Sequence, residues 1–134
     1  MYLLDTNIVS ELRKPRPNPR VVHWIAQVPD AQLFISAVTI GEIQSGIEMT
    51  RDQDPDRARA IERWLDQVIS TSQVIDLGAD IWRRWGKLMH RKSNTLLEDA
   101  LIAACALSRD LTVVTRNVSD FDAFGVTVIN PFAL

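Results

Sequence analysis

Apolar residues along this chain alternate between short continuous runs and longer stretches with helical spacing. Continuous apolar runs of four to six residues are typical of strands that are buried on both faces of a sheet. The five runs of this kind, YLLD, LFIS, QVIDL, LTVVT and GVTVIN, predict strands at residues 2–5, 33–36, 73–77, 111–115 and 125–130.

Between these runs, apolar residues recur every three or four positions, which predicts amphipathic helices. The predicted helices cover residues 8–12, 18–28, 39–49, 54–69, 78–92 and 96–109. The clearest helix start is at Asp54, a good N-cap residue, followed by Pro55 at the first helical position. Residues 13–20, RKPRPNPR, carry three prolines and predict a stiff loop between two helices.

This alternation of strands and helices implies right-handed crossover connections, and therefore a parallel sheet with helices on both faces. The expected fold class is α/β: a three-layer α/β/α sandwich with a mostly parallel, roughly five-stranded sheet. A length of 134 residues fits one domain, residues 1–134, with a substantial core.

Composition narrows the class of protein. With 46% hydrophobic residues, the chain is neither disordered nor fibrous. No apolar stretch approaches the ~18 residues of a membrane span, and no signal peptide follows Met1, so we expect a cytoplasmic protein. The single cysteine, Cys105, excludes an internal disulfide and disfavours a cysteine-based zinc site. A net charge of −2 neither requires nor excludes a nucleic-acid partner.

Four acidic residues fall where a parallel sheet builds its sites, beyond the carboxyl ends of the strands. Asp5 ends the first predicted strand, and Glu42 lies in the first turn of the helix that follows the second. Asp99 lies near the start of the helix before the fourth strand, and Asp120 follows that strand. An all-oxygen cluster without nearby histidine or cysteine suits Mg²⁺ or Mn²⁺ better than zinc.

Each of these acids also has a purely structural explanation. Asp5 could cap the helix that follows it, and Asp120 could stabilise a turn. The pairs Thr39–Glu42 and Thr95–Glu98 both have the spacing of a capping box. The same stretches offer one obvious basic partner for an acid, Arg116.

Four motifs in this order resemble the PIN-domain family, and more closely the VapC- and FitB-type toxin ribonucleases of bacterial toxin–antitoxin operons. They are LLDTNIVSEL (3–12), ISAVTIGEIQSGI (35–47), LEDALIAACAL (97–107) and LTVVTRNVSDF (111–121). The resemblance covers essentially the whole chain. It implies an α/β/α sandwich and cleavage of single-stranded RNA that depends on Mg²⁺ or Mn²⁺ and leaves a 5′-phosphate and a 3′-hydroxyl.

The resemblance also assigns roles to residues. The catalytic and metal-binding acids fall on Asp5, Glu42, Asp99 and Asp120. Many members carry an acid directly after the Thr-Arg pair, where this chain has Asn117, so the fourth position lies between Asn117 and Asp120. Supporting polar groups fall on Thr6, Asn117 and Thr115.

The partners implied by the resemblance are an RNA substrate, a second copy of the chain in a homodimer, and a cognate antitoxin of the VapB or FitA kind. The antitoxin is expected to direct a basic C-terminal arm toward the acids. Contact with DNA is expected only through the antitoxin.

Two basic groups are candidates for contact with RNA phosphates. The candidate residues are Arg13, Lys14 and Arg16 in the loop, with Arg20 at its end, and Arg83, Lys87 and Arg91, which share a face of the predicted helix 78–92. A solvated helix face is the alternative for the second group. No aromatic residue is evident for base stacking, because the tryptophans of that helix fall on its apolar side.

Two other functions remain open. A phospho-accepting receiver domain also gathers acids beyond parallel strands, but it needs paired acids after the first strand and a lysine after the last. A non-catalytic PIN-like regulator that binds RNA or protein would keep the fold without the chemistry.

Overall fold

The computed structural model describes residues 1–134 and is built around one parallel sheet. The strand order is β3-β2-β1-β4-β5, and every neighbouring pair is parallel. The strands are β1 (Tyr2–Leu4), β2 (Leu33–Ser36), β3 (Gln73–Ile75), β4 (Thr112–Val114) and β5 (Val128–Ile129). Each lies within its predicted range, so the five predicted strands and the α/β class are confirmed.

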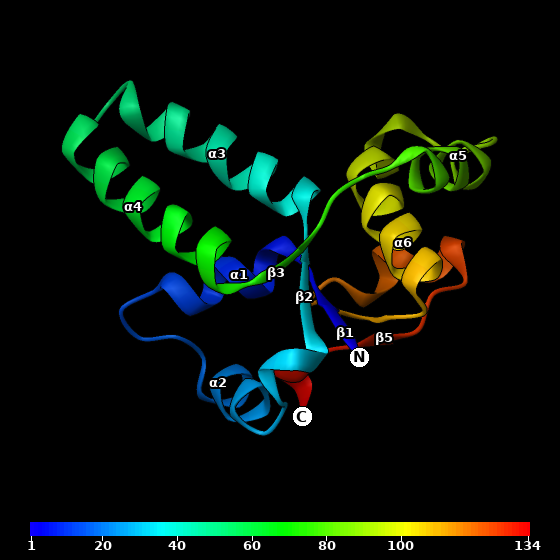
Figure 1. Ribbon diagram of the computed structural model, residues 1–134, viewed down its shortest axis with the longest axis horizontal. Coiled ribbons are helices and arrows are strands. Elements are labelled where there is room, and N and C mark those ends of the chain that lie inside the picture. The colour runs from blue at the N-terminus through cyan, green and yellow to red at the C-terminus, as the bar shows by residue number, and fades with distance from the viewer.

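Helices cover both faces of the sheet, which Figure 1 shows nearly edge-on between them. One layer contains α1 (Thr6–Arg13), α2 (Pro19–Ala26), α3 (Ala37–Arg51) and α4 (Pro55–Thr71). The opposite layer contains α5 (Ala79–Leu88) and α6 (Leu97–Arg109). Short 3₁₀ helices connect these elements: η1 (Asp30–Gln32), η2 (Asn94–Leu96), η3 (Val118–Phe124) and η4 (Pro131–Ala133).

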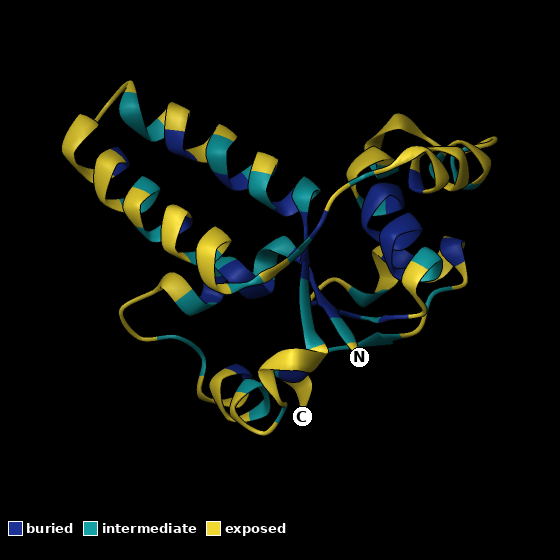
Figure 2. Ribbon diagram, in the orientation of Figure 1, coloured by how far each residue is buried: buried dark blue, intermediate teal, exposed yellow.

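The sheet separates two hydrophobic cores. Because successive residues of a strand face opposite sides, Leu3 packs into the α5/α6 core and Leu4 into the core under α1, α3 and α4. Residues 100–106 of α6 are all buried, and this helix forms the darkest part of its layer in Figure 2. The small side chains of the AACA segment allow α6 to pack closely against the sheet.

The helix starts explain where the acids lie. Asp5 caps α1 and Asp54 caps α4 through their side chains, so both predicted caps are confirmed. The two capping boxes that the spacing allowed as alternatives do not form. Ser36 caps α3, which places Glu42 in its second turn rather than its first, and α6 begins without a side-chain cap.

The helix predicted over residues 78–92 is shorter in the structure than the apolar spacing indicates. It ends at Leu88, and Arg91 has a φ of 60°, which an α-helix cannot contain. Arg91 therefore does not continue the basic face of Arg83 and Lys87. Trp82 also departs from the prediction, since its surface is 46% exposed and its ring meets Trp85 edge to face with centroids 5.5 Å apart.

The strand order excludes the receiver-domain alternative. Receiver domains have the flavodoxin-like order 2-1-3-4-5, whereas this sheet has the order 3-2-1-4-5.

None of the helices combines the length and the apolar character that a bilayer crossing would require.

Replacing the fully buried Ile81 by alanine should remove the main anchor of α5 in its core. We expect the free energy of unfolding in urea to fall by about 2–5 kcal/mol, the usual cost of such a cavity. The matched control is Ile69→Ala on α4, where the side chain is 43% exposed. It should change the free energy by about 0.5 kcal/mol at most, and equal losses in both variants would contradict this packing.

Candidate active site

Asp5 is the most buried of the predicted acids, with 6% of its surface exposed. Its carboxylate accepts hydrogen bonds from the backbone N–H of Thr6 at 2.8 Å, the hydroxyl of Thr115 at 2.9 Å and the side-chain amide of Asn7 at 3.2 Å. Pairing of β1 with β4 brings Thr115 alongside, because the backbone N–H of Asp5 donates to the carbonyl of Val114 at 2.9 Å. Both carboxylate oxygens are therefore held in place.

Asn7 connects this carboxylate to the segment after β4. Its amide also donates to the Thr115 hydroxyl at 3.2 Å, and its carbonyl accepts the backbone N–H of Arg116 at 3.1 Å. The backbone N–H of Asn117 donates to Thr115 at 3.0 Å, so Asn117 contributes its backbone here. Asn7 is a residue that the sequence analysis missed, although it stands in the LLDTN motif.

Glu42 is half-buried on α3 and faces the start of α1. One of its carboxylate oxygens accepts the hydroxyl proton of Thr6 at 3.0 Å. Because Thr6 has one hydroxyl proton, its second contact, at 3.0 Å, has the buried Thr39 as the donor. The spacing along the chain indicates only a helix cap for Thr39, whereas its actual contact orients Thr6 toward Glu42.

Asp99 and Asp120 differ from the first two acids, because their carboxylates accept no hydrogen bond from the rest of the chain. Asp99 is half-buried in the first turn of α6, and Asp120 is exposed on η3. Their oxygens are free to bind a cation or a solvent molecule.

The pKa values indicate that the acids interact. Burial raises the pKa of Asp99 to about 6, with further contributions from Asp5, Asp120 and Glu98. Burial also raises the pKa of Asp5, while its hydrogen bonds to Thr115, Thr6 and Asn7 oppose the shift. The structure thus brings Asp5, Asp99 and Asp120 into one electrostatic cluster.

Glu42 joins this cluster through Asp5 and through a fifth acid, Glu98. Burial, and then repulsion by Glu98, raise the pKa of Glu42 to about 7. Glu98 was interpreted as part of a capping box and is the second functional candidate that the sequence analysis missed. Its proximity to Glu42 depends on how α6 packs beside α3, which local spacing does not reveal.

No basic side chain neutralises this acidic cluster. None of the chain's five ion pairs includes these acids, and the guanidinium of Arg116 lies 4.8 Å from the ring centroid of Phe132 instead. No three of the acids are close enough in this arrangement to hold one ion together. The donors are nevertheless all oxygens, and Mg²⁺ commonly completes its shell with water, so the residues fit a hydrated hard cation.

The predicted RNA contacts are spread over two regions. Lys14 forms an ion pair with Glu11 at 2.9 Å, whereas Arg13, Arg16, Arg83 and Lys87 are exposed without ion pairs. Glu42 and Glu98 line a groove of about 470 Å³ whose other wall includes the exposed Trp82. Trp82 is therefore an exception to the prediction that the tryptophans of this helix fall on its apolar side, because it is exposed beside this groove.

The raised pKa of Glu42 predicts a specific pH dependence. Folded chains bind more protons than unfolded chains between the ordinary glutamate value of 4.5 and about 7. Stability supplied by this group is therefore complete at low pH and declines as the pH rises through that window.

We expect the free energy of unfolding of the wild type, relative to Glu42→Gln, to decrease between about pH 4.5 and pH 7.5. Urea denaturation at constant ionic strength without divalent cations measures this difference. Comparison with the glutamine variant cancels the contributions of carboxylates that do not interact with Glu42, so the difference reports Glu42 together with its coupling to Glu98 and Asp5. A difference that stays constant with pH would contradict the assigned electrostatics.

Comparison with known proteins places this geometry in a family. The sequence profile of the PIN domain matches residues 2–125. Plasmid stability protein StbB of Pseudomonas syringae is 33% identical over 139 residues, covering 98% of this chain and 99% of that protein. VapC ribonuclease Y4jK of Sinorhizobium fredii is 31% identical over 140 residues, covering 98% of both. Toxin FitB of Neisseria gonorrhoeae is 29% identical over 140 residues, covering 98% and 99%.

The fold agrees with these relatives over the full chain. The crystal structure of FitAcB from Neisseria gonorrhoeae superimposes with a TM-score of 0.87 and 29% identity, covering 100% of both chains. The family resemblance of the four motifs is thereby confirmed. This chain belongs to the PIN-domain family, and its relatives within it are proteins of the VapC and FitB type.

Proposed function

We propose that this chain is the toxin of a type II toxin–antitoxin pair and an endoribonuclease that hydrolyses phosphodiester bonds of single-stranded RNA with a divalent cation. Its relatives include a protein named as a toxin and one named as a VapC ribonuclease. PIN-family membership implies a divalent metal in general, and the hard oxygen donors favour Mg²⁺ or Mn²⁺.

One observation supports this proposal above the others. Five acids repel one another at the carboxyl edge of the sheet, and no basic group of the chain relieves the repulsion. Such an arrangement is unfavourable for the chain alone, and a bound cation would offset it. Unrelieved repulsion between carboxylates, with raised pKa values, is more typical of functional sites than of structural ones.

The proposed site residues have different roles. Asp5, Asp99 and Asp120 would hold a hydrated cation, partly through bound water because no three of the acids are close enough to ligate one ion directly, with Glu42 at the edge of the same cluster. The bound cation would lower the pKa of a water molecule and offset charge on the leaving oxygen. Asn7 and Thr115 would keep the Asp5 carboxylate oriented, and Thr6 would do the same for Glu42. Asp120 suits the fourth acidic position better than Asn117, because its charge acts on both Asp5 and Asp99.

The acidic site also suggests how the protein is inhibited. A basic arm of an antitoxin encoded beside this chain could neutralise the same carboxylates that attract a cation. We propose a homodimer of this chain as the enzyme, acting in the cytoplasm, with DNA contacted only through the antitoxin.

The two hydrophobic cores lie on opposite faces of the same sheet, which supports a single domain over residues 1–134.

Substitution of the acids tests the proposed chemistry. Asp99→Asn and Asp120→Asn should each reduce cleavage of a mixed single-stranded RNA pool in Mg²⁺ or Mn²⁺ by about 100-fold or more, since each removes a charge that the cation needs. EDTA should have the same effect on the wild type. The control is Asp122→Asn, which is also exposed on η3 two residues from Asp120 and should retain full activity.

Full cleavage by Asp99→Asn, or cleavage that persists in EDTA, would contradict the proposal. Purified wild type that binds RNA with either metal and never cleaves it would support the non-catalytic regulator instead. Mapping the cut ends should show a 5′-phosphate and a 3′-hydroxyl.

The antitoxin proposal makes a separate prediction. Co-expression with the product of the adjacent gene should relieve growth arrest by this chain and abolish RNA cleavage by the purified complex. Replacement of the basic residues in that partner's C-terminal arm by alanine should restore cleavage while the complex remains intact on gel filtration. An arm variant that inhibits as well as the native partner would argue against neutralisation of the acids.

A further inference from the structure

Two adjoining cavities lead away from the acidic cluster between α1, α3 and α4. The first has a volume of about 320 Å³ and begins at Thr6 and Glu42, then passes Ser10 and Trp64. The second has a volume of about 420 Å³ and is lined by Gln53, Asp54 and Arg57. The residues common to both cavities are Arg13, Thr50 and Ile61. The two cavities therefore adjoin at these residues, and together they are here named the α1–α4 groove.

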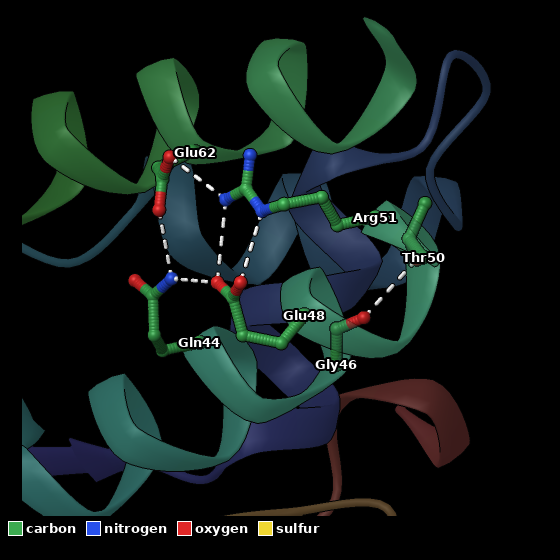
Figure 3. Close-up of polar contacts among 6 residues, drawn as sticks. All are labelled: Gln44, Gly46, Glu48, Thr50, Arg51 and Glu62. Atoms are coloured by element: carbon green, nitrogen blue, oxygen red, sulfur yellow. Dashed lines mark hydrogen bonds and ion pairs between the residues drawn. The ribbon is translucent and has the colours of Figure 1, made fainter. Parts of the chain in front are cut away.

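A polar network fixes the walls of this groove by joining α3 to α4 (Figure 3). Arg51 binds Glu48 on its own helix and Glu62 on α4, each at 2.9 Å. Gln44 donates to the same two carboxylates at 2.7 and 2.8 Å. Because these side chains satisfy one another, the α3–α4 pair is held as a unit, and Arg51 is not available to a ligand.

The groove contains two guanidinium groups that form no ion pair. Arg13 lies with its guanidinium 5.9 Å from the ring centroid of Trp64, and Arg57 is exposed in the first turn of α4. Asp54, the acid in the lining of the second cavity, accepts the backbone N–H of Arg57 as the helix cap. In contrast, Arg59 on the same helix is paired with Asp56. Arg13 and Arg57 are therefore the free positive charges of this groove.

The two ends of the groove carry opposite charge, and this limits what can occupy it. An acidic peptide would suit Arg13 and Arg57 but would be repelled by the acidic cluster at the other end. A basic peptide would suit the acidic end alone. A phosphodiester strand with a divalent cation on one phosphate suits both ends, and Ser10, Thr50 and Gln53 offer hydrogen-bonding groups between them.

We propose that single-stranded RNA lies along the α1–α4 groove, with the phosphate to be cleaved at the acidic cluster and phosphates on one side of it bound by Arg13 and then Arg57. This inference rests on the proposed ribonuclease function and adds the path of the substrate. The contacts are with the backbone of the strand, so they position RNA without reading its sequence.

Binding measurements on the full chain test this path. In the Asp99→Asn background, fluorescence anisotropy with a labelled, mixed-sequence single-stranded RNA gives the affinity at several salt concentrations. The double variant Arg13→Gln/Arg57→Gln should bind about tenfold more weakly, and the slope of log affinity against log salt should decrease by about 1.4, or about 0.7 for each lost phosphate contact. Arg13→Lys/Arg57→Lys should recover most of the affinity, because charge is retained.

The matched control is Arg63→Gln, which removes an exposed, unpaired arginine of α4 that does not line the groove. It should leave affinity and slope unchanged. In the active enzyme, the double glutamine variant should raise KM several-fold with kcat within about twofold of the wild type, as expected when ground-state and transition-state binding are lost equally.

The possible failures are distinguishable. Wild type that neither binds nor cleaves RNA removes the proposed function, and the groove inference with it. An active enzyme whose affinity and KM do not change in the double variant removes the groove inference alone. A double variant that loses binding to the antitoxin but keeps its affinity for RNA would assign the groove to the protein partner and would also overturn this inference.

Discussion

Burial of the Asp5 carboxylate at the end of the central strand is the interaction on which the site depends. Burying a charged group is costly unless hydrogen bonds replace its water. Here the replacements come from three places: the start of α1, the side chain of Asn7, and Thr115 beyond β4. They can meet only if β1 lies beside β4 in the observed parallel register. Strand pairing and the position of the carboxylate therefore depend on each other.

The other acids lie at the same edge of the sheet for two reasons. The helix α3 begins directly after β2, and α6 packs beside α3. Helix N-termini favour negative charge, which offsets part of the repulsion at Asp99 in the first turn of α6. The remaining repulsion and burial still raise the pKa values of Asp5, Glu42 and Asp99. The chain thus keeps a local arrangement that disfavours folding but favours a cation, a compromise that is common at functional sites.

The long α3–α4 pair has a different role from the compact layer of α5 and α6. Apolar contacts at Ile47 and Leu65, together with the Arg51 network, hold it as a unit that extends beyond the sheet (Figure 1). Its inner side continues from the acids toward the unpaired Arg57, whereas Arg59 on the same helix is paired with Asp56. Arg13 and Arg57 both line one groove, whereas Arg63 on α4 is also unpaired but lies outside that groove.

Local sequence was sufficient to determine the strands, most helix bounds and the edge at which Asp5 lies, because these depend on side-chain periodicity and on caps a few residues apart. The four motifs were sufficient to indicate the family. Only the tertiary structure decided that Asn7 joins Asp5 to Thr115, that Glu98 acts on Glu42, and that Arg13 and Arg57 share one groove. It also decided that Trp82 is exposed and that Arg91 leaves the helix. These features depend on strand order, on helix packing and on where a helix stops, and the spacing of residues along the chain does not encode distances between segments that meet only after folding.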